Sequence, residues 1–181
     1  MIYTAVKALD NILDNFIQGS DSRDYKRAVY SASRERSIGL GVMGYHGMFM
    51  KQGIPFESVA ARSLNKIVFK AIHECAKKAS RQLAVERGPC PDGGDQRNSY
   101  ILSIAPTANI SVICGSATPC IEPIAGNAYL QKTLSGSFLV KNPYLEALLE
   151  KYGKNEPEVW RKIIDYKGSV QFLEFLKMAK Q

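Results

Sequence analysis

The 181-residue sequence lacks the patterns that mark several common protein classes. Its four cysteines form no Cys-x-x-Cys pair and it has only two histidines, which argues against a zinc site or a disulfide framework and indicates reduced thiols in the cytoplasm. No apolar run approaches membrane-spanning length, and the first residues show no signal pattern. The formal charge of +7 comes from scattered lysines and arginines, without a basic run interleaved with aromatics. We therefore expect no membrane partner and no nucleic-acid partner.

Helical periodicity and chain breakers predict most of the secondary structure. The strongest prediction is one long amphipathic helix over residues 58–87, bounded by Ser58 and Gly88. The polar segment 18–36 is expected to be a loop. Shorter helices are expected over residues 5–16, 143–153 and 156–164. Residues 127–140 are expected to be extended, with a bend at Ser135 and Gly136.

Residues 39–44 read Gly-Leu-Gly-Val-Met-Gly and match the Gly-x-Gly-x-x-Gly pattern of dinucleotide-binding proteins. That pattern needs a strand immediately before it, but residues 34–37 are too polar for a buried strand, and no acidic residue follows in the required context. We instead expect these glycines to lie in a helix where backbones pack closely, with His46 as a packed or surface residue. A nicotinamide-dependent oxidoreductase would rest on this motif alone, and an NADH titration should exclude it.

The cysteines stand in no context typical of a reactive thiol. Cys75 falls on the apolar face of the long helix, where a buried inert thiol is the expectation. Cys90 lies in a turn and is expected to be more exposed, without a nearby histidine or basic cluster that would lower its pKa.

The chain is organised around residues 97–123. Residues 100–105 are predicted to form a buried strand that ends at Pro106, because proline cannot donate to a sheet ladder. Thr107, Asn109 and Ser111 follow at the start of a short helical turn. Two interpretations remain open: these side chains cap the turn, or the unpaired amides of the turn bind an anion such as phosphate.

Four segments carry a resemblance to a known family: RSIGLGVMGYH at 36–46, RNSYILSIAPTANIS at 97–111, CIEPI at 120–124, and QKTLSGSFLVKNPYLE at 131–146. In this order they resemble the large (alpha) subunit of class I ribonucleotide reductase. The resemblance implies an α/β fold, in which residues 1–181 are a part of that subunit's ten-stranded α/β barrel domain, without an internal domain boundary. A fragment of the subunit or one piece of a split gene is the expectation.

The resemblance also implies a site and its partners. A ribonucleoside diphosphate would be held by the hydroxyl of Thr107 and the amides that follow it, within the loop formed by Pro106, Thr107, Ala108, Asn109, Ile110 and Ser111. No catalytic residue is assigned, because the family's thiyl and reducing cysteines lie on segments before this chain and its relay tyrosines and tail cysteines lie after it. We expect no metal and no cofactor on this chain, and a radical from a metal-containing small subunit. Partners would be that small subunit and the remaining large-subunit sequence.

A second function from another class also fits the sequence. The chain would then be a non-catalytic phosphate-binding or assembly module that keeps the loop without the radical machinery. A lone Glu122, without a partner acid, base or metal ligand, specifies no reaction of its own.

Overall fold

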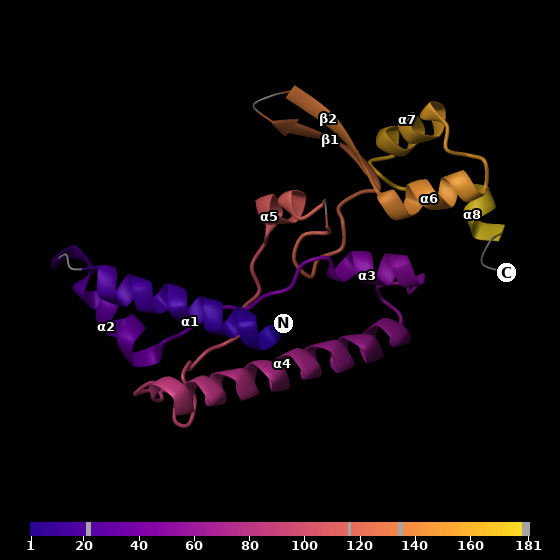
Figure 1. Ribbon diagram of the computed structural model, residues 1–181. Helices are drawn as coiled ribbons and strands as arrows, with labels where there is room; N and C mark the ends of the chain where they lie inside the picture. Colours follow the sequence, from indigo (N-terminus) through magenta and orange to yellow (C-terminus); the bar gives the residue numbers. More distant parts are fainter. Residues whose placement is uncertain (21–22, 116, 134–135, 179–181) are drawn as a thin grey trace.

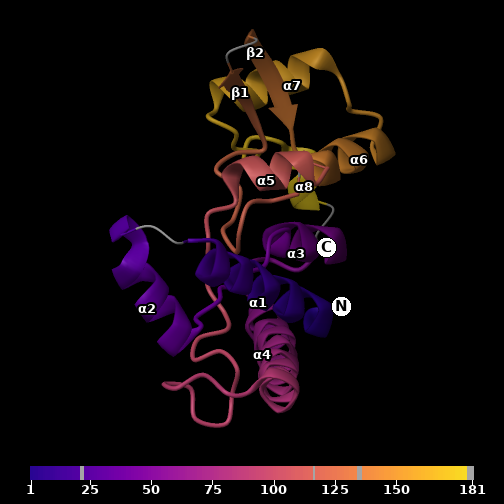
Figure 2. The same cartoon turned by 60° about the vertical axis from the view of Figure 1, so that its left-hand side comes forward.

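The computed structural model describes residues 1–20, 23–115, 117–133 and 136–178. Helices α1, α2 and α4 gather at one end, the β-hairpin and helices α6 to α8 at the other, and α3 and α5 lie between them (Figures 1 and 2). The elements are α1 (Ile2–Gly19), a 3₁₀ turn (Arg23–Tyr25), α2 (Lys26–Glu35), α3 (Tyr45–Gln52), α4 (Val59–Arg87), α5 (Ala108–Ile113), β1 (Ala128–Thr133), β2 (Gly136–Lys141), α6 (Pro143–Lys151), α7 (Pro157–Asp165) and α8 (Glu174–Met178).

The predicted long helix is confirmed as α4. Ser58 caps it, since the Ser58 side chain accepts a hydrogen bond from the amide of Ala61, and Gly88 ends it with a φ of 85°. Its C-terminal half packs against α1, the helix predicted over residues 5–16. The shared core of buried side chains consists of Val6, Ala76, Ala79, Leu83 and Ile101.

The prediction of a loop over residues 18–36 is wrong, because α2 occupies most of its second half. The charged residues that indicated a loop are lysine, arginine and glutamate, which together with alanine have high helix propensity. None of the residues of α2 is buried, so its apolar content gave little signal. The helix ends at Arg36, which adopts a left-handed φ of 47°.

Residues 39–44 are not helical, contrary to the expectation, and α3 begins only at Tyr45. Residues 38–40 instead pair with residues 100–103, since the amide of Ile38 donates to the carbonyl of Tyr100 and the amide of Ser103 donates to the carbonyl of Leu40. A Cβ added to Gly39 would lie 2.8 Å from the Cβ of Ser103, and one added to Gly41 would lie 2.8 Å from the Ser103 carbonyl oxygen. The glycines therefore permit close backbone packing, as expected, but between two extended segments.

The buried strand predicted over residues 100–105 is reduced to a short parallel pairing. The amide of Leu40 donates to the carbonyl of Ile101 at 2.8 Å, and the only isolated bridge in the described ranges pairs Leu40 with Leu102. Tyr100 is 70% exposed and Ile104 is 69% exposed. Residues 100–105 therefore pair with the chain on one side only and over few residues, and they do not form a strand. Their apolar pattern alone had predicted a buried strand.

The extended segment predicted over residues 127–140 and the helices predicted over residues 143–153 and 156–164 are confirmed. Strands β1 and β2 pair antiparallel, with Ala128 opposite Lys141 and Thr133 opposite Gly136. Ser135 of the expected bend lies outside the described residues. Asn142 caps α6 by accepting from the amide of Tyr144. Helices α6 and α7 pack with the base of the hairpin around a core of Ala128, Leu145, Leu149, Trp160, Ile163 and Leu173.

Within the residues that the structure describes, no helix combines the length and the apolar character needed to cross a membrane.

Candidate functional site: the loop before helix α5

The candidate loop, residues 106–111, joins an extended segment to the short helix α5. Thr107 lies directly before α5 with a φ of 51°, in the left-handed region that β-branched residues rarely adopt. Such strain persists only where the surrounding structure holds it, and it is commonest at functional sites. The side chains that face solvent around this turn are those of Pro106, Ala108, Asn109 and Ile110.

The hydroxyl of Thr107 contacts a distant part of the chain. The amide of Cys120 donates to Thr107 Oγ1 at 2.7 Å, and the Thr107 side chain makes no capping bond to α5. The interpretation of Thr107 as a simple helix cap is therefore wrong. Because a hydroxyl carries one proton as well as two acceptor lone pairs, this bond leaves the hydroxyl proton to donate to an anion.

Ser111, the last residue of the predicted loop, points into the protein. It is 3% exposed, and its hydroxyl donates to the carbonyl of Ala108 at 3.1 Å. A contact between this hydroxyl and a phosphate would require the bond to Ala108 to open. Of the two hydroxyl groups in the loop, that of Thr107 is thus the more accessible.

A cleft of about 520 Å³ lies beside the loop, between α3, α5 and the base of the hairpin. Lys141 lines it, but the ammonium of Lys141 lies 3.3 Å from the Glu146 carboxylate and 4.8 Å from the centre of the Trp160 ring. Its ammonium is therefore already paired with groups on α6 and α7. The other lining residues include Gly47, Ala108, Ser111, Thr118 and Tyr144.

The sequence matches the family described as ribonucleotide reductase, barrel domain, over residues 1–93 and 94–181. The chain belongs to this family. The solved class Id ribonucleotide reductase alpha subunit of Actinobacillus ureae superposes with a TM-score of 0.88 at 37% identity, over 96% of this chain and 32% of that one. The fold is thus that of the corresponding part of a ribonucleotide reductase alpha subunit, as the sequence segments indicated.

Curated relatives give the same result. The ribonucleoside-diphosphate reductase large subunit of Invertebrate iridescent virus 6 is 40% identical over 99% of this chain, and that of Invertebrate iridescent virus 3 is 38% identical over 96%. The vitamin B12-dependent ribonucleoside-diphosphate reductase of Thermoplasma acidophilum is 32% identical over 91%. The chain spans 19%, 28% and 22% of the lengths of these three relatives, in that order of mention.

Two of the cysteines lie in environments opposite to those that their positions in the sequence predicted. Cys75 is exposed on α4, because it lies outside the face of that helix, formed by Ala76, Ala79 and Leu83, that packs against α1. Cys90 is 2% exposed, and its sulfur fills the space where Gly93 has no side chain. In the described part of the chain, no three histidine, cysteine, aspartate or glutamate side chains gather as metal ligands.

His46 is a packed residue, as expected. Its Nδ1 accepts a hydrogen bond of 3.3 Å from the amide of Ile124, and its ring lies edge-on to Phe56. Burial lowers the pKa of His46, which favours the neutral ring that can accept this bond. The histidine thereby joins α3 to the CIEPI segment.

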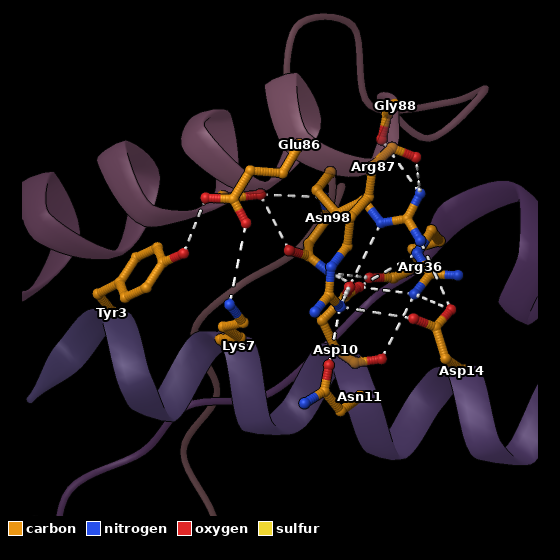
Figure 3. A network of polar contacts seen from close by, with 12 residues as sticks. Tyr3, Lys7, Asp10, Asn11, Asp14, Arg36, Glu86, Arg87, Gly88 and Asn98 are labelled. Atoms are coloured by element: carbon orange, nitrogen blue, oxygen red, sulfur yellow. Dashed lines mark hydrogen bonds and ion pairs between the residues drawn. The ribbon is translucent and has the colours of Figure 1, made fainter.

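A buried polar network, which the sequence analysis did not anticipate, joins four segments at the other end of the molecule (Figure 3). Asp10 of α1 is fully buried, and its carboxylate accepts from Arg36 at 2.7 Å and from Arg87 at 2.9 Å. Asn98 donates to the same carboxylate at 3.1 Å, and Arg97 donates to it at 3.3 Å. A signal was present, because Asp10 follows Val6 by four residues and so lies on the buried face of α1.

The charges of this network outweigh the cost of burying Asp10. Burial by itself raises the pKa of Asp10, but the hydrogen bond and charge of Arg36, together with Arg97 and Asn98, hold that pKa below its ordinary value. Arg36 and Arg97 are the first residues of two of the segments that resemble the family. These two arginines therefore fix the extended segments that lead to α3 and to the candidate loop.

Proposed function

We propose that this chain supplies the loop that holds the substrate diphosphate in a ribonucleotide reductase large subunit. The substrate class is a ribonucleoside diphosphate, and the residues concerned are Pro106, Thr107, Ala108, Asn109, Ile110 and Ser111. The observation that carries the proposal is the strained turn at Thr107, held by the amide of Cys120, in a chain of this family.

Backbone amides are the main donors in this proposal. The first amides of a helix have no carbonyl partner within the helix. In α5 these amides belong to residues 108–110, which are exposed to solvent. Because α5 is only six residues long, its dipole contributes less than the amides themselves. The hydroxyl of Thr107 adds its proton to the same set, so the loop binds an anion without a lysine.

The reduction itself is assigned to other parts of the enzyme. Removal of the ribose 2′ hydroxyl requires a thiyl radical and two reducing thiols, which the remaining large-subunit sequence would supply. A metal-containing small subunit would generate the radical, and the assembled enzyme would act in the cytoplasm on precursors of DNA. The role of this chain is then to bind and orient the diphosphate, so that the ribose meets the reacting thiols.

The substitution Asn109→Asp in the assembled enzyme tests the proposal. It adds a negative charge with almost no change of shape, at an exposed position in the first turn of α5. A carboxylate there interacts favourably with the helix N-terminus, so stability should not fall, whereas a bound diphosphate would be repelled. We expect a rise in the KM for the ribonucleoside diphosphate of about tenfold, the equivalent of about 1.4 kcal/mol.

The matched control is Asn15→Asp, the same change at an exposed position of α1 far from the loop. It should leave KM unchanged. An unchanged KM in Asn109→Asp would contradict the proposal. The assembly could also bind the diphosphate, lose that binding in Asn109→Asp, and yet form no deoxynucleotide. That result would support the non-catalytic module instead.

A further inference from the structure

Helix α3 begins without a capping residue of its own. Its N-cap position is Gly44, which has no side chain to accept from the first amides. The acceptor comes from a residue 71 positions later, since the amide of Gly47 donates to the hydroxyl of Thr118 at 3.1 Å. Gly47 is the third residue of α3, the position whose amide a local Ser or Thr cap usually binds.

Thr118 contacts α3 through its backbone as well. The amide of Gly44 donates to the carbonyl of Thr118 at 2.7 Å, and the residue is 7% exposed. The space is fitted to this contact, because a Cβ on Gly47 would lie 3.6 Å from Thr118 Oγ1 and 3.2 Å from the hydroxyl of Tyr144. The start of α3 and residue 118 therefore form one rigid contact.

The segment 117–120 connects this contact to both ends of the candidate loop. On one side the amide of Ala117 donates to the carbonyl of Ser111 at 3.0 Å. On the other side the amide of Cys120 donates to the hydroxyl of Thr107 at 2.7 Å. Thr107 and Cys120 both have left-handed backbones, with φ of 51° and 46°. Two strained residues bonded to each other need an external support, and Thr118 lies two residues from Cys120.

We propose that Thr118 is a positioning residue for the substrate diphosphate, which it never touches. Its two bonds to the first turn of α3 fix the segment 117–120, and that segment sets the geometry of Thr107 and of the amides after it. The inference rests on the function proposed above, because it assumes that residues 106–111 hold the diphosphate. It adds α3 to the parts of the chain on which substrate affinity depends.

The test compares Thr118→Val with Thr118→Ser in the assembled reductase. Valine keeps the shape and removes the hydroxyl that accepts from Gly47, whereas serine keeps the hydroxyl. We expect valine to raise the KM for the ribonucleoside diphosphate by roughly five- to tenfold, the equivalent of losing one capping bond, with a smaller change in kcat. Serine should restore KM to near its original value.

Ser58→Ala is the matched control, since Ser58 makes the same kind of bond to the third amide of α4. It should lower the melting temperature without raising KM, which separates loss of a cap from loss of loop geometry. Amide hydrogen exchange of residues 107–113 gives a second readout should Thr118→Val assemble poorly. Exchange there should accelerate in Thr118→Val and remain unchanged in Ser58→Ala.

The measurements distinguish a failure of the inference about Thr118 from a failure of the proposed function. A Thr118→Val enzyme with lowered stability, unchanged KM and unchanged exchange in residues 107–113 would overturn the inference while Asn109→Asp still raises KM. Unchanged KM in both Thr118→Val and Asn109→Asp would remove the proposed function, and the inference with it.

Discussion

The amide of Cys120 donates a 2.7 Å hydrogen bond to the hydroxyl of Thr107, and both residues have positive φ. The bond closes the region 107–120 into a loop whose two ends share one contact. It gives the Thr107 side chain a structural role beside the proposed contact with phosphate. Substitutions at Thr107 therefore report on both roles, and they need variants that separate them.

Replacing Thr107 with valine should lower both stability and substrate affinity, because the buried amide of Cys120 loses its acceptor. An unsatisfied buried donor costs about 1–3 kcal/mol. Thr107→Ser keeps the hydroxyl and should retain most of both properties. Melting temperature and KM of the assembled enzyme measure the two effects, and a valine variant that changes neither would contradict the importance of this bond.

Asp10→Asn should destabilise the α1 end of the molecule strongly. It leaves the guanidinium groups of Arg36 and Arg97 with only the partly exposed Asp14 as counter-ion, and losing one partner of a buried ion pair costs up to about 3–5 kcal/mol. Hydrogen exchange of the α1 amides within the large subunit measures the loss. Asp92→Asn is the control, because Asp92 pairs with Arg34 at the exposed surface, and its loss should change exchange little.

The same carboxylate gives a pH dependence of known sign. The pKa of Asp10 is lower in the folded protein than its ordinary value of 3.8, so folding favours the ionised form. Its contribution to stability is complete above that ordinary value and is lost as pH falls through the folded pKa. Stability measured between neutral pH and pH 3 should fall more steeply in the wild type than in Asp10→Asn. Equal slopes would show that Asp10 is not the titrating group.

Gly41→Ala should destabilise the pairing of residues 38–40 with residues 100–103. The new Cβ would lie 2.8 Å from the Ser103 carbonyl oxygen, and a backbone atom cannot move aside as a side chain can, so we expect a loss of about 1–3 kcal/mol. Gly19→Ala is the control, because no heavy atom lies within 4 Å of its added Cβ. It should be neutral or slightly stabilising in a thermal melt.

Residues 1–181 expressed alone should self-associate and form no deoxynucleotide. Large apolar side chains face solvent on separate elements, among them Ile67, Ile104 and Ile113, which are 65%, 69% and 83% exposed. Such surfaces favour association with another chain. Light scattering and product assays with the small subunit added should show aggregation and no activity.

Co-expression with the upstream part of a large subunit provides the comparison, and it should raise the yield of soluble protein. A lone chain that melts cooperatively as a monomer would contradict the folding prediction. Deoxynucleotide formation by the lone chain would contradict the assignment of catalysis to other segments.

Sequence periodicity predicted those elements whose signals are local. The stripe and caps of α4, the extended character of residues 127–140 and the Asn-Pro start of α6 are each read from neighbouring residues, and all three are confirmed. The same method failed where composition and structure diverge. The charged residues of α2 indicated a loop although they favour helix, and the apolar residues 100–105 indicated a strand although only one side is paired.

Local sequence patterns could not predict the long-range contacts around the candidate site and in the Asp10 network. Thr118 caps a helix 71 residues earlier in the chain, and Asn98 binds a carboxylate 88 residues earlier. No periodicity connects such positions. The local pattern left a cap and an anion site both open at residues 107–111, and the family resemblance favoured the anion site. What that resemblance did not supply was the bond between Thr107 and Cys120, which assigns the threonine a second role.

The buried charges around Asp10 also bear on the order of folding. The hydrogen bonds of α4 span four residues, whereas Asp10 meets Arg87 and Arg97 across 77 and 87 residues. Closing loops of that length costs chain entropy before any contact forms, so such contacts form late. During synthesis Asp10 leaves the ribosome long before Arg97, and its carboxylate stays hydrated in the interval. We expect the nascent chain to hold α1 and α4 as loosely associated helices until residue 98 has emerged, and only then to dehydrate this cluster.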